Sequence, residues 1–400
     1  MMSFVHRFSK EKTSIVYTFL VIIYSFLFIY HIGKSSFTIA DFFLVSLFFF
    51  LMVNFFINKK TFNYVNELLP FIFFVTVHFF LALFLDFDVG KIGSTSRYLF
   101  YLVVVFFGAR NFFLPSFGVK LYESICVIST VYLIVQTIFF TFFHVLLPGH
   151  IQNSYFPVLS NHLNVIEKAL SEEWVNVLRP AAFFAEPAHC AEYLLGGLCI
   201  SLFAIKKIKL SILLTIGVLV SMSSTGILVS IVIWLLWLAD FLGKKIRIES
   251  LVLFLSILPL MIAFVFTSSF FDHFLTRMKD GESSIGRFNG YYEILQNGLI
   301  SKFDIFFGSG MDTSIYSSYL AGYARLFVFF GLIGVVCFLV FAIMTFLSKK
   351  IVRWQKIMMF VFLILNTGTE ILFQPMILCF FSFILCLLDR EDITKECLAP

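Results

Sequence analysis

Charged residues are scarce in this chain of 400 residues. Asp, Glu, Lys and Arg together make up 13% of the sequence, hydrophobic residues make up 60%, and the mean hydropathy is +0.97. Soluble domains carry about 25% charged residues, so this composition excludes an ordinary soluble domain. It predicts an integral membrane protein, in which the 58 phenylalanines would serve as filler against lipid.

Motifs for metal or cofactor chemistry are also lacking. The seven cysteines lie mostly in apolar segments and show no C-x-x-C spacing, so neither a disulfide framework nor a zinc site is predicted. The sequence has no glycine-rich phosphate loop, no Ser-His-Asp set and no metal-ligand spacing. We therefore expect no cofactor and no nucleic-acid partner.

Long apolar runs recur along the chain, and a membrane span needs about 20 apolar residues. We predict an all-α polytopic integral membrane protein, with a single membrane domain over residues 1–400 and about twelve transmembrane helices. The expected spans are 14–32, 38–57, 68–86, 98–114, 121–145, 188–205, 210–223, 225–242, 250–268, 322–347, 355–372 and 374–388.

The basic residues predict the orientation of these spans, because cytoplasmic loops are enriched in Lys and Arg. The first apolar run has no small-residue cleavage site after it, so we expect a retained span and a cytoplasmic N-terminus. The C-terminus then also falls inside. The basic groups on that side are His6 to Lys12, Lys59-Lys60, Arg110 with Lys120, Lys206 to Lys209, Lys244 to Arg247, and Lys349 to Lys356.

This orientation depends on dividing residues 210–242 into two short spans at Ser223-Ser224-Thr225-Gly226. A non-helical break at membrane depth is tolerated only inside protein or beside a wet cavity. Two outside loops are then long, at 146–187 and 269–321. We predict that they hold the functional residues.

The exit of the first long loop carries several polar side chains together. Pro187 suits the first position of a helix, so Glu186 should lie at the N-cap, with His189 on the same helical face. Helix N-termini attract phosphate, and Arg179 precedes this one. Plainer roles also fit, since Arg179 could anchor the interface, Glu186 could cap the helix, and the deeper Glu192 could pair with an arginine.

The second long loop contains an amphipathic stretch at 283–299. Apolar residues including Tyr291 recur there at helical spacing, which predicts a helix lying in the membrane interface with Arg287 near its start. Further on, Arg325 sits just inside an apolar helix. An unpaired arginine at that depth is costly, so Arg325 should meet an acid or a phosphate. Glu186 and Glu192 are candidate acids.

Other polar residues are weaker candidates. Asp86-Phe87-Asp88 resembles a metal–nucleotide motif, but it lies at the outer end of a span where no nucleotide sugar is expected. Arg97 can simply anchor the following span. We expect His78 and His144 to be core or interface residues, and His273 is a weak candidate for a base.

Four short motifs follow the order found in one family. Arg-Pro-x-x-Phe-Phe-x-Glu-Pro at 179–187, Ser-x-Ser-Ser-Thr-Gly at 221–226, Arg287 with Gly298, and Gly322-Tyr323-x-Arg325 resemble motifs of the O-antigen polymerases. The resemblance covers roughly residues 175–345. The spacing from Arg179 to Gly196 is longer than the usual pattern of that family.

The resemblance implies an enzyme that polymerises oligosaccharide repeat units at the periplasmic face of the bacterial inner membrane. The partners it implies are an undecaprenyl-diphosphate-linked oligosaccharide as donor and as acceptor, membrane lipid, a chain-length regulator and a repeat-unit flippase. The product would be O-antigen or capsular polysaccharide.

The same resemblance, combined with the chemistry of the side chains, suggests roles for individual residues. Arg179, Arg287 and Arg325 would hold the diphosphate, because guanidinium groups bind it bidentately. Glu186 would be the general base, with His189 as the second choice. Further substrate-binding candidates are Tyr323, Tyr291 and Glu192.

Three other functions compete with a polymerase. An O-antigen ligase uses the same donor but delivers to a lipid A core, and the Gly-Tyr-x-Arg opening at 322–325 favours the polymerase. A flippase or transporter would place its charges and broken helices near the midplane, whereas here the polar groups gather in outside loops. A non-catalytic assembly partner is the third alternative.

Overall fold

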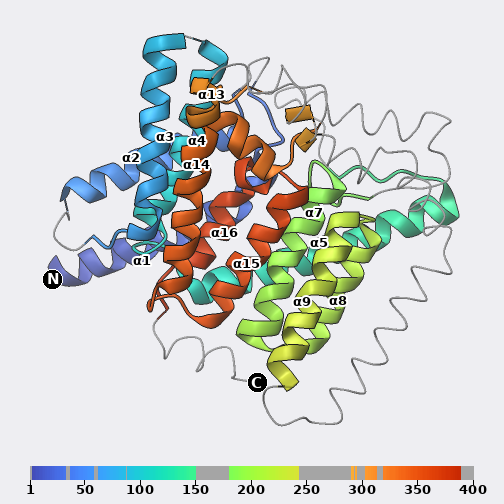
Figure 1. The fold of residues 1–400 in the computed structure, drawn as a ribbon. Coiled ribbons are helices and arrows are strands. Elements are labelled where there is room, and N and C mark those ends of the chain that lie inside the picture. The colour runs from blue at the N-terminus through green and yellow to red at the C-terminus, as the bar shows by residue number, and fades with distance from the viewer. Residues whose placement is uncertain are drawn as a thin grey trace.

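The computed structural model describes residues 2–32, 37–57, 62–86, 88–149, 180–242, 290, 291, 293, 294, 302–312 and 319–388. In these residues every regular element is a helix, and a single bridge pairs His31 with Thr38 (Figure 1). The all-α prediction is therefore confirmed. The elements are α1 (Met2–Leu27), α2 (Ile39–Ile57), η2 (Asn66–Leu68), α3 (Leu69–Leu81), η3 (Ala82–Asp86), α4 (Val89–Gly108), α5 (Pro115–Phe143), α7 (Pro187–Cys199), η5 (Ile200–Ile205), α8 (Ile208–Val220), α9 (Ser224–Leu242), α13 (Lys302–Phe307), α14 (Gly322–Leu347), α15 (Arg353–Gly368), η6 (Ile371–Phe373) and α16 (Met376–Leu385).

Apolar helices of membrane-crossing length dominate the fold. Each predicted span overlaps a helix, except 250–268, which lies outside the described residues. Six helical stretches in the described part of the chain are long and apolar enough to cross a membrane: Ile39–Ile57, Asn66–Phe84, Pro115–Phe143, Pro187–Ile205, Ser224–Phe241 and Gly322–Leu347. The total of twelve spans and the two long outside loops stay predictions.

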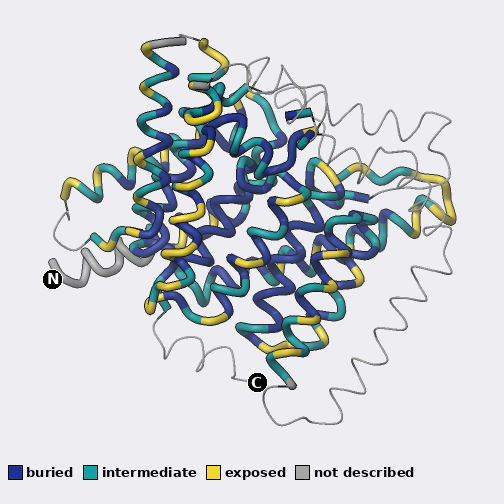
Figure 2. Tube along the Cα trace, viewed as in Figure 1, coloured by how far each residue is buried: buried dark blue, intermediate teal, exposed yellow. Residues whose placement is uncertain are grey.

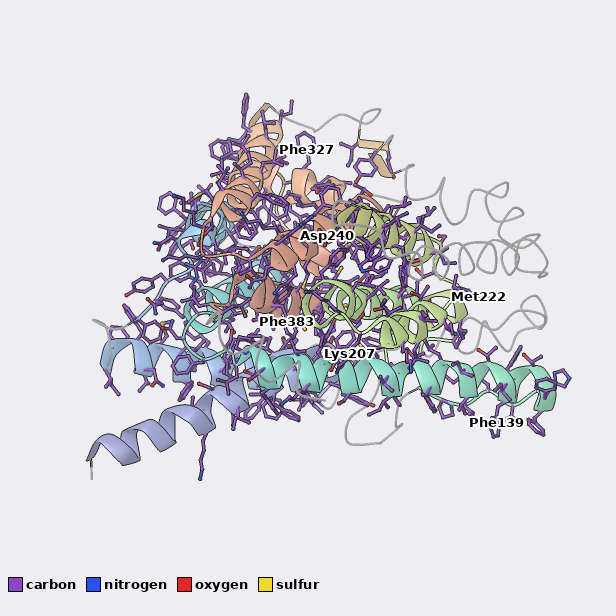
Figure 3. All side chains as sticks on the ribbon, turned by 90° about the horizontal axis from the view of Figure 1, so that it is seen from below. Phe139, Lys207, Met222, Asp240, Phe327 and Phe383 are labelled. Atoms are coloured by element: carbon purple, nitrogen blue, oxygen red, sulfur yellow. The ribbon has the colours of Figure 1, made fainter. Side chains whose placement is uncertain are left out.

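The long helix α5 illustrates how the surface suits lipid. It begins with Pro115 at its first turn and ends at His144, whose left-handed backbone (φ 54°) closes the helix. Its far end projects beyond the neighbouring helices, with Phe139 near the tip (Figure 3). Phe139, Phe142 and Phe143 are exposed there. Exposed aromatic side chains of this kind fit an acyl-chain environment rather than water.

The helix α7 lies at the centre of the fold. In Pro187–Ile205, 78% of the residues are buried, against 28% to 50% in the other membrane-length helices. It packs against α5, α8, α9 and α15, and the dark core of Figure 2 surrounds it. All ten residues of α16 are buried as well. The body of α7, buried continuously from Cys190 to Cys199, is therefore fixed by packing from several sides.

Glycines allow α5 to approach α7 closely. A Cβ atom at Gly196 would lie 2.5 Å from the Tyr122 hydroxyl, and one at Gly197 would lie 2.7 Å from Cys126 Sγ. The Tyr122 hydroxyl donates a hydrogen bond to the Tyr193 carbonyl at 2.6 Å. Close approach through small residues is a usual packing mode of membrane helices. Gly196, which ends the first motif of the resemblance, serves helix packing here.

The predicted break within 210–242 is confirmed. Helix α8 ends at Val220, Met222 adopts a left-handed backbone (φ 55°), and α9 begins at Ser224. Ser223 Oγ accepts a hydrogen bond from Gly226 N at 3.3 Å and so serves the first turn of α9. The break lies at 221–223, slightly earlier than predicted.

A second break, inside α14, differs from the uninterrupted span predicted for 322–347. Gly331 has φ 62° and ψ −167°, which interrupts the helix. The carbonyls of Val328 and Phe329 instead accept hydrogen bonds from the backbone N–H groups of Ser309 at 2.8 Å and Gly310 at 3.2 Å. The segment after α13 therefore supplies the donors that the helix lacks at this turn. It satisfies carbonyl groups that would otherwise be unpaired in lipid.

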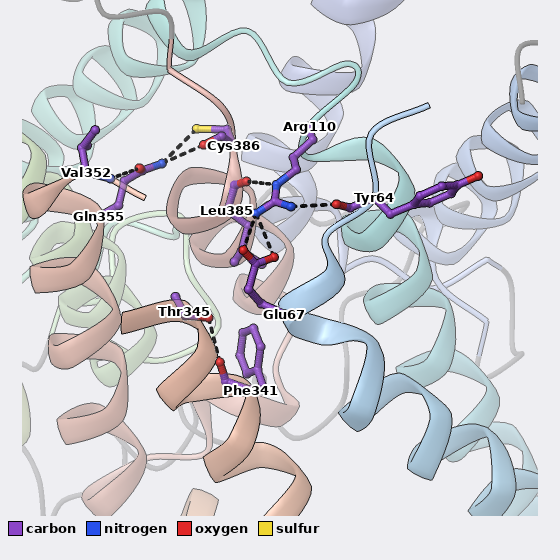
Figure 4. Close-up of polar contacts among 9 residues, drawn as sticks. All are labelled: Tyr64, Glu67, Arg110, Phe341, Thr345, Val352, Gln355, Leu385 and Cys386. Carbon is purple, nitrogen blue, oxygen red and sulfur yellow. Dashed lines mark hydrogen bonds and ion pairs between the residues drawn. The ribbon is translucent and has the colours of Figure 1, made fainter. Parts of the chain in front are cut away.

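A buried cluster around Arg110 joins the turn after α4 to η2 and α16 (Figure 4). Arg110 Nη2 donates to both carboxylate oxygens of Glu67 at 2.8 Å, Nη1 donates to the Tyr64 carbonyl at 2.7 Å, and Nε donates to the Leu385 carbonyl at 3.3 Å. The sequence analysis counted Arg110 among the basic residues of a cytoplasmic loop, and the structure places it in the turn between α4 and α5 with its side chain buried. The guanidinium is buried because nearly all its donors find acceptors.

Gln355 extends this cluster to the start of α15. Its Nε2 donates to the carbonyls of Phe383 at 2.8 Å and Cys386 at 3.0 Å, and its Oε1 accepts from Val352 N at 3.0 Å. Gln355 is fully buried and both ends of its amide are bonded. The first turn of α15 is thereby tied to the last turn of α16, so these two helices run antiparallel.

Candidate functional site

The other end of the α15–α16 pair is the candidate site. Between the helices, η6 turns the chain, and the Asn366 side chain accepts from Leu372 N at 3.1 Å while donating to the Phe362 carbonyl at 2.9 Å. Phe373 packs against aromatic rings of α4 and α14. We call residues 363–374 the junction. Its backbone is fixed from both sides, so it can hold side chains in defined positions.

Helix α14 starts on this junction. Gly322 N donates to the Thr369 carbonyl at 2.7 Å. One turn later, the Arg325 guanidinium forms an ion pair with Glu370, and its Nε donates to the Leu320 carbonyl at 2.9 Å. The two charged side chains are 23% and 21% exposed, so solvent reaches both. The acid that Arg325 requires is therefore Glu370, which the sequence did not single out.

Helix α7 meets the opposite end of the same junction. Glu186 has extended backbone angles at the N-cap (φ −143°, ψ 154°), as predicted. Its side chain is exposed and makes no capping hydrogen bond within the described residues, so the carboxylate is not used as a cap. On the first turn, His189 Nε2 lies 2.7 Å from Gln374 Nε2. The amide nitrogen can only donate, so in this arrangement the unprotonated Nε2 of the imidazole accepts the hydrogen bond.

Glu192 lies one turn deeper than His189 in α7. Its side chain is only 2% exposed. Glu192 is thus removed from the solvent-accessible mouth where Glu186 lies, and it belongs to the interior of the helix bundle.

Two tyrosines named from the sequence also contact α15. The Tyr323 hydroxyl donates to the Leu363 carbonyl at 2.9 Å, and the Tyr291 hydroxyl donates to the Thr367 carbonyl at 3.3 Å. Burial raises the pKa of the Tyr291 phenol, which keeps the donor protonated. In this structure both hydroxyls tie their segments to the junction.

Candidates from separate segments of the sequence therefore gather around the junction. Arg325 binds Glu370 and His189 binds Gln374, while Arg179 and Arg287 lie outside the described residues. Sequence reasoning missed Glu370 and Gln374 because it counted them as parts of the spans 355–372 and 374–388. A signal was present in Glu370, since an acid inside an apolar run is a functional candidate.

The weaker candidates have structural partners elsewhere. Asp88 caps α4 by accepting from Gly90 N at 2.8 Å, and Arg97 binds Asp41 through two contacts of 2.8 and 2.9 Å. His78 is buried, with its ring centre 5.1 Å from that of Phe330. Among the residues that the structure describes, no group of three or more His, Cys, Asp or Glu side chains is arranged to hold a metal ion.

No family model, curated protein or solved structure matches this chain. What the site can do must be inferred from its side chains. A partly exposed guanidinium such as that of Arg325 can bind an anion such as phosphate, and an imidazole such as that of His189 can accept a proton. Both groups are held by one short segment, at one end of the helix bundle.

Proposed function

We propose that this protein polymerises undecaprenyl-diphosphate-linked oligosaccharide repeat units, at the periplasmic face of the inner membrane, into O-antigen or capsular polysaccharide. The observation that supports this most is the gathering of Arg325, His189 and Glu370 on the junction, with the exposed Glu186 at the N-cap of the helix that carries His189. Transfer of a glycan from a lipid diphosphate needs a cationic group for the leaving diphosphate and a base for the acceptor hydroxyl.

Arg325 is the cationic group in this proposal. Its guanidinium is paired with Glu370 but remains accessible, so the diphosphate can take the place of that carboxylate. A planar guanidinium binds phosphate oxygens bidentately, which a lysine ammonium cannot do. It would stabilise the negative charge that grows on the diphosphate oxygen as the glycosidic bond breaks. Arg179 and Arg287 enter the proposal from the sequence alone.

Glu186 is the general base in this proposal, with His189 as the second choice. Both precede or open α7, and the central packing of that helix holds them at its mouth. Because the Glu186 carboxylate makes no cap hydrogen bond among the described residues, its oxygens remain able to accept a proton.

The two polar clusters fit the orientation that the basic residues predict. The junction and the Arg110 cluster lie at opposite ends of the antiparallel α15–α16 pair. The positive-inside rule assigns the Arg110 end to the cytoplasm, which would place the junction at the periplasmic end. That is where a lipid-linked repeat unit would be used.

The test is a reaction with purified protein in lipid nanodiscs and lipid-linked repeat units purified from the producing cells. A ladder of products supports the polymerase. With lipid A core added, core-linked products would indicate the ligase instead, and the absence of any covalent change would indicate a transporter or an assembly partner.

One pair of variants sharpens this test. Arg325→Gln should slow polymer formation about 100-fold or more, as expected for loss of a group that stabilises transition-state charge. Arg353→Gln is the matched control, because Arg353 also pairs with an acid, Asp240, but at the other end of α15. It should polymerise normally. A normal ladder from Arg325→Gln would contradict the proposed role of Arg325.

A further inference from the structure

The side-chain amide of Gln374 has a buried oxygen that accepts no hydrogen bond within the described residues. Its side chain is 7% exposed, and its Nε2 faces His189. Within the part of the chain that the structure describes, the buried Oε1 has no hydrogen-bond partner. Leaving such an atom unpaired costs stability, so its presence beside the candidate base points to a ligand that completes it.

This feature does not depend on how the amide is oriented. With the amide turned over, Oε1 would accept from His189 and Nε2 would become the atom in need of a partner. In either orientation, one buried polar atom of Gln374 remains next to the imidazole. A hydroxyl group satisfies both cases, since it can donate to an oxygen and accept from a nitrogen.

Gln355 shows that an unpaired amide is not a general property of this helix pair. It lies in the same α15–α16 pair, at the opposite end, and is completely buried. All of its bonding groups nevertheless reach backbone partners, at Val352, Phe383 and Cys386. All polar groups of Gln355 are thus hydrogen-bonded within the fold, whereas Gln374 has one polar atom left unpaired beside His189.

We propose that Gln374 is a substrate-binding residue that receives a sugar hydroxyl of the acceptor repeat unit, next to the His189 imidazole. This inference rests on the proposed function for the identity of the acceptor. The hydroxyl-binding subsite itself rests on the geometry of Gln374. Its role is to orient the acceptor sugar and select it, while the proton passes to Glu186 or His189.

The experiment compares Gln374→Met with Gln355→Met, two substitutions of similar volume. Gln374→Met removes the unpaired atom together with one hydrogen bond, that to His189, and should lower the unfolding temperature in nanodiscs only slightly. Gln355→Met removes three hydrogen bonds to backbone groups and should lower it much more. In the polymerisation assay, Gln374→Met should raise KM for the repeat unit about 3- to 10-fold, the usual effect of one neutral hydrogen bond, with little change in kcat.

Binding measured without turnover separates this inference from the proposed function. Lipid-linked repeat units should raise the unfolding temperature of the wild-type protein more than that of Gln374→Met. Undecaprenyl diphosphate without sugar should stabilise both proteins equally. If the repeat unit binds in this Gln374-dependent way but no ladder forms, the subsite stands and the polymerase proposal fails.

Three results would overturn the subsite while leaving the polymerase intact. The first is an unchanged KM for Gln374→Met in a protein that forms ladders. The second is a loss of stability or of folding as severe as that of Gln355→Met. The third is that the stabilisation by sugar-free undecaprenyl diphosphate is reduced in Gln374→Met as much as the stabilisation by the repeat unit. The second would make Gln374 a structural residue, and the third would assign it to the diphosphate.

Discussion

The buried pair of Arg110 and Glu67 allows a quantitative test of what holds the helices together. The two side chains are 1% and 9% exposed, and Arg110 donates to the Glu67 carboxylate and to two backbone carbonyls. Arg110→Gln leaves the carboxylate buried without its counter-ion. Breaking a buried pair from one side costs about 3–5 kcal/mol, because the remaining charge stays desolvated.

The exposed pair of Lys207 and Glu123 provides the control. Lys207 is 52% exposed and its Nζ lies 3.3 Å from the carboxylate, so this pair should contribute only about 0–1 kcal/mol. For unfolding in nanodiscs, we expect Arg110→Gln to lower the midpoint by on the order of 10 °C and Lys207→Gln by a few degrees at most.

A double substitution separates the charge from the packing. Arg110→Met with Glu67→Leu removes both charges and restores apolar volume, so it should recover much of the loss caused by Arg110→Gln. The measurement is the thermal midpoint of the monodisperse protein, followed by intrinsic fluorescence. If Arg110→Gln unfolds no earlier than Lys207→Gln, the Arg110 cluster does not hold η2, α4 and α16 together.

Two glycine substitutions test the segments that shape the site. Gly322→Ala places a Cβ atom 2.3 Å from Asn366 Oδ1 and 2.9 Å from the Thr369 carbonyl, so it should displace Arg325 from Glu370 and lower polymer yield more than tenfold in the ladder assay. Gly331→Ala places a Cβ atom 2.4 Å from the backbone of Phe306, at a residue with positive φ, and should lower the unfolding midpoint. Its control is Gly93→Ala, whose Cβ atom has nothing within 4 Å and which should keep or raise the midpoint. An unchanged yield from the first, or equal midpoints for the other two, would contradict these expectations.

The helices were predictable because apolar runs of membrane length leave little choice of structure. Local chemistry also fixed the start of α7, since Pro187 at the first turn places Glu186 at the N-cap. The break between α8 and α9 followed from the polar run that begins at Ser221. In each case the deciding interaction lies within a few residues of the feature.

The features that sequence reasoning missed depend on partners far away in the chain. Arg325 required an acid, but nothing local to it indicates that the acid is Glu370. The break at Gly331 was not predicted, because the neighbouring residues 306–310 belong to a separate segment of the chain. Arg110 was counted only as a basic residue that indicates orientation, because its acceptors on Tyr64, Glu67 and Leu385 lie far from it in the sequence.

The break in α14 has a consequence for how the chain is made. A translocon releases a helix into lipid readily when its backbone is self-sufficient, and the first half of α14 is not, since Val328 and Phe329 rely on Ser309 and Gly310. Those two residues leave the ribosome before α14 does. The N–H groups that satisfy the carbonyls of the broken turn are therefore already synthesised when the helix emerges. A circular permutation that reversed this order would leave those carbonyls without hydrogen bonds in the bilayer during insertion.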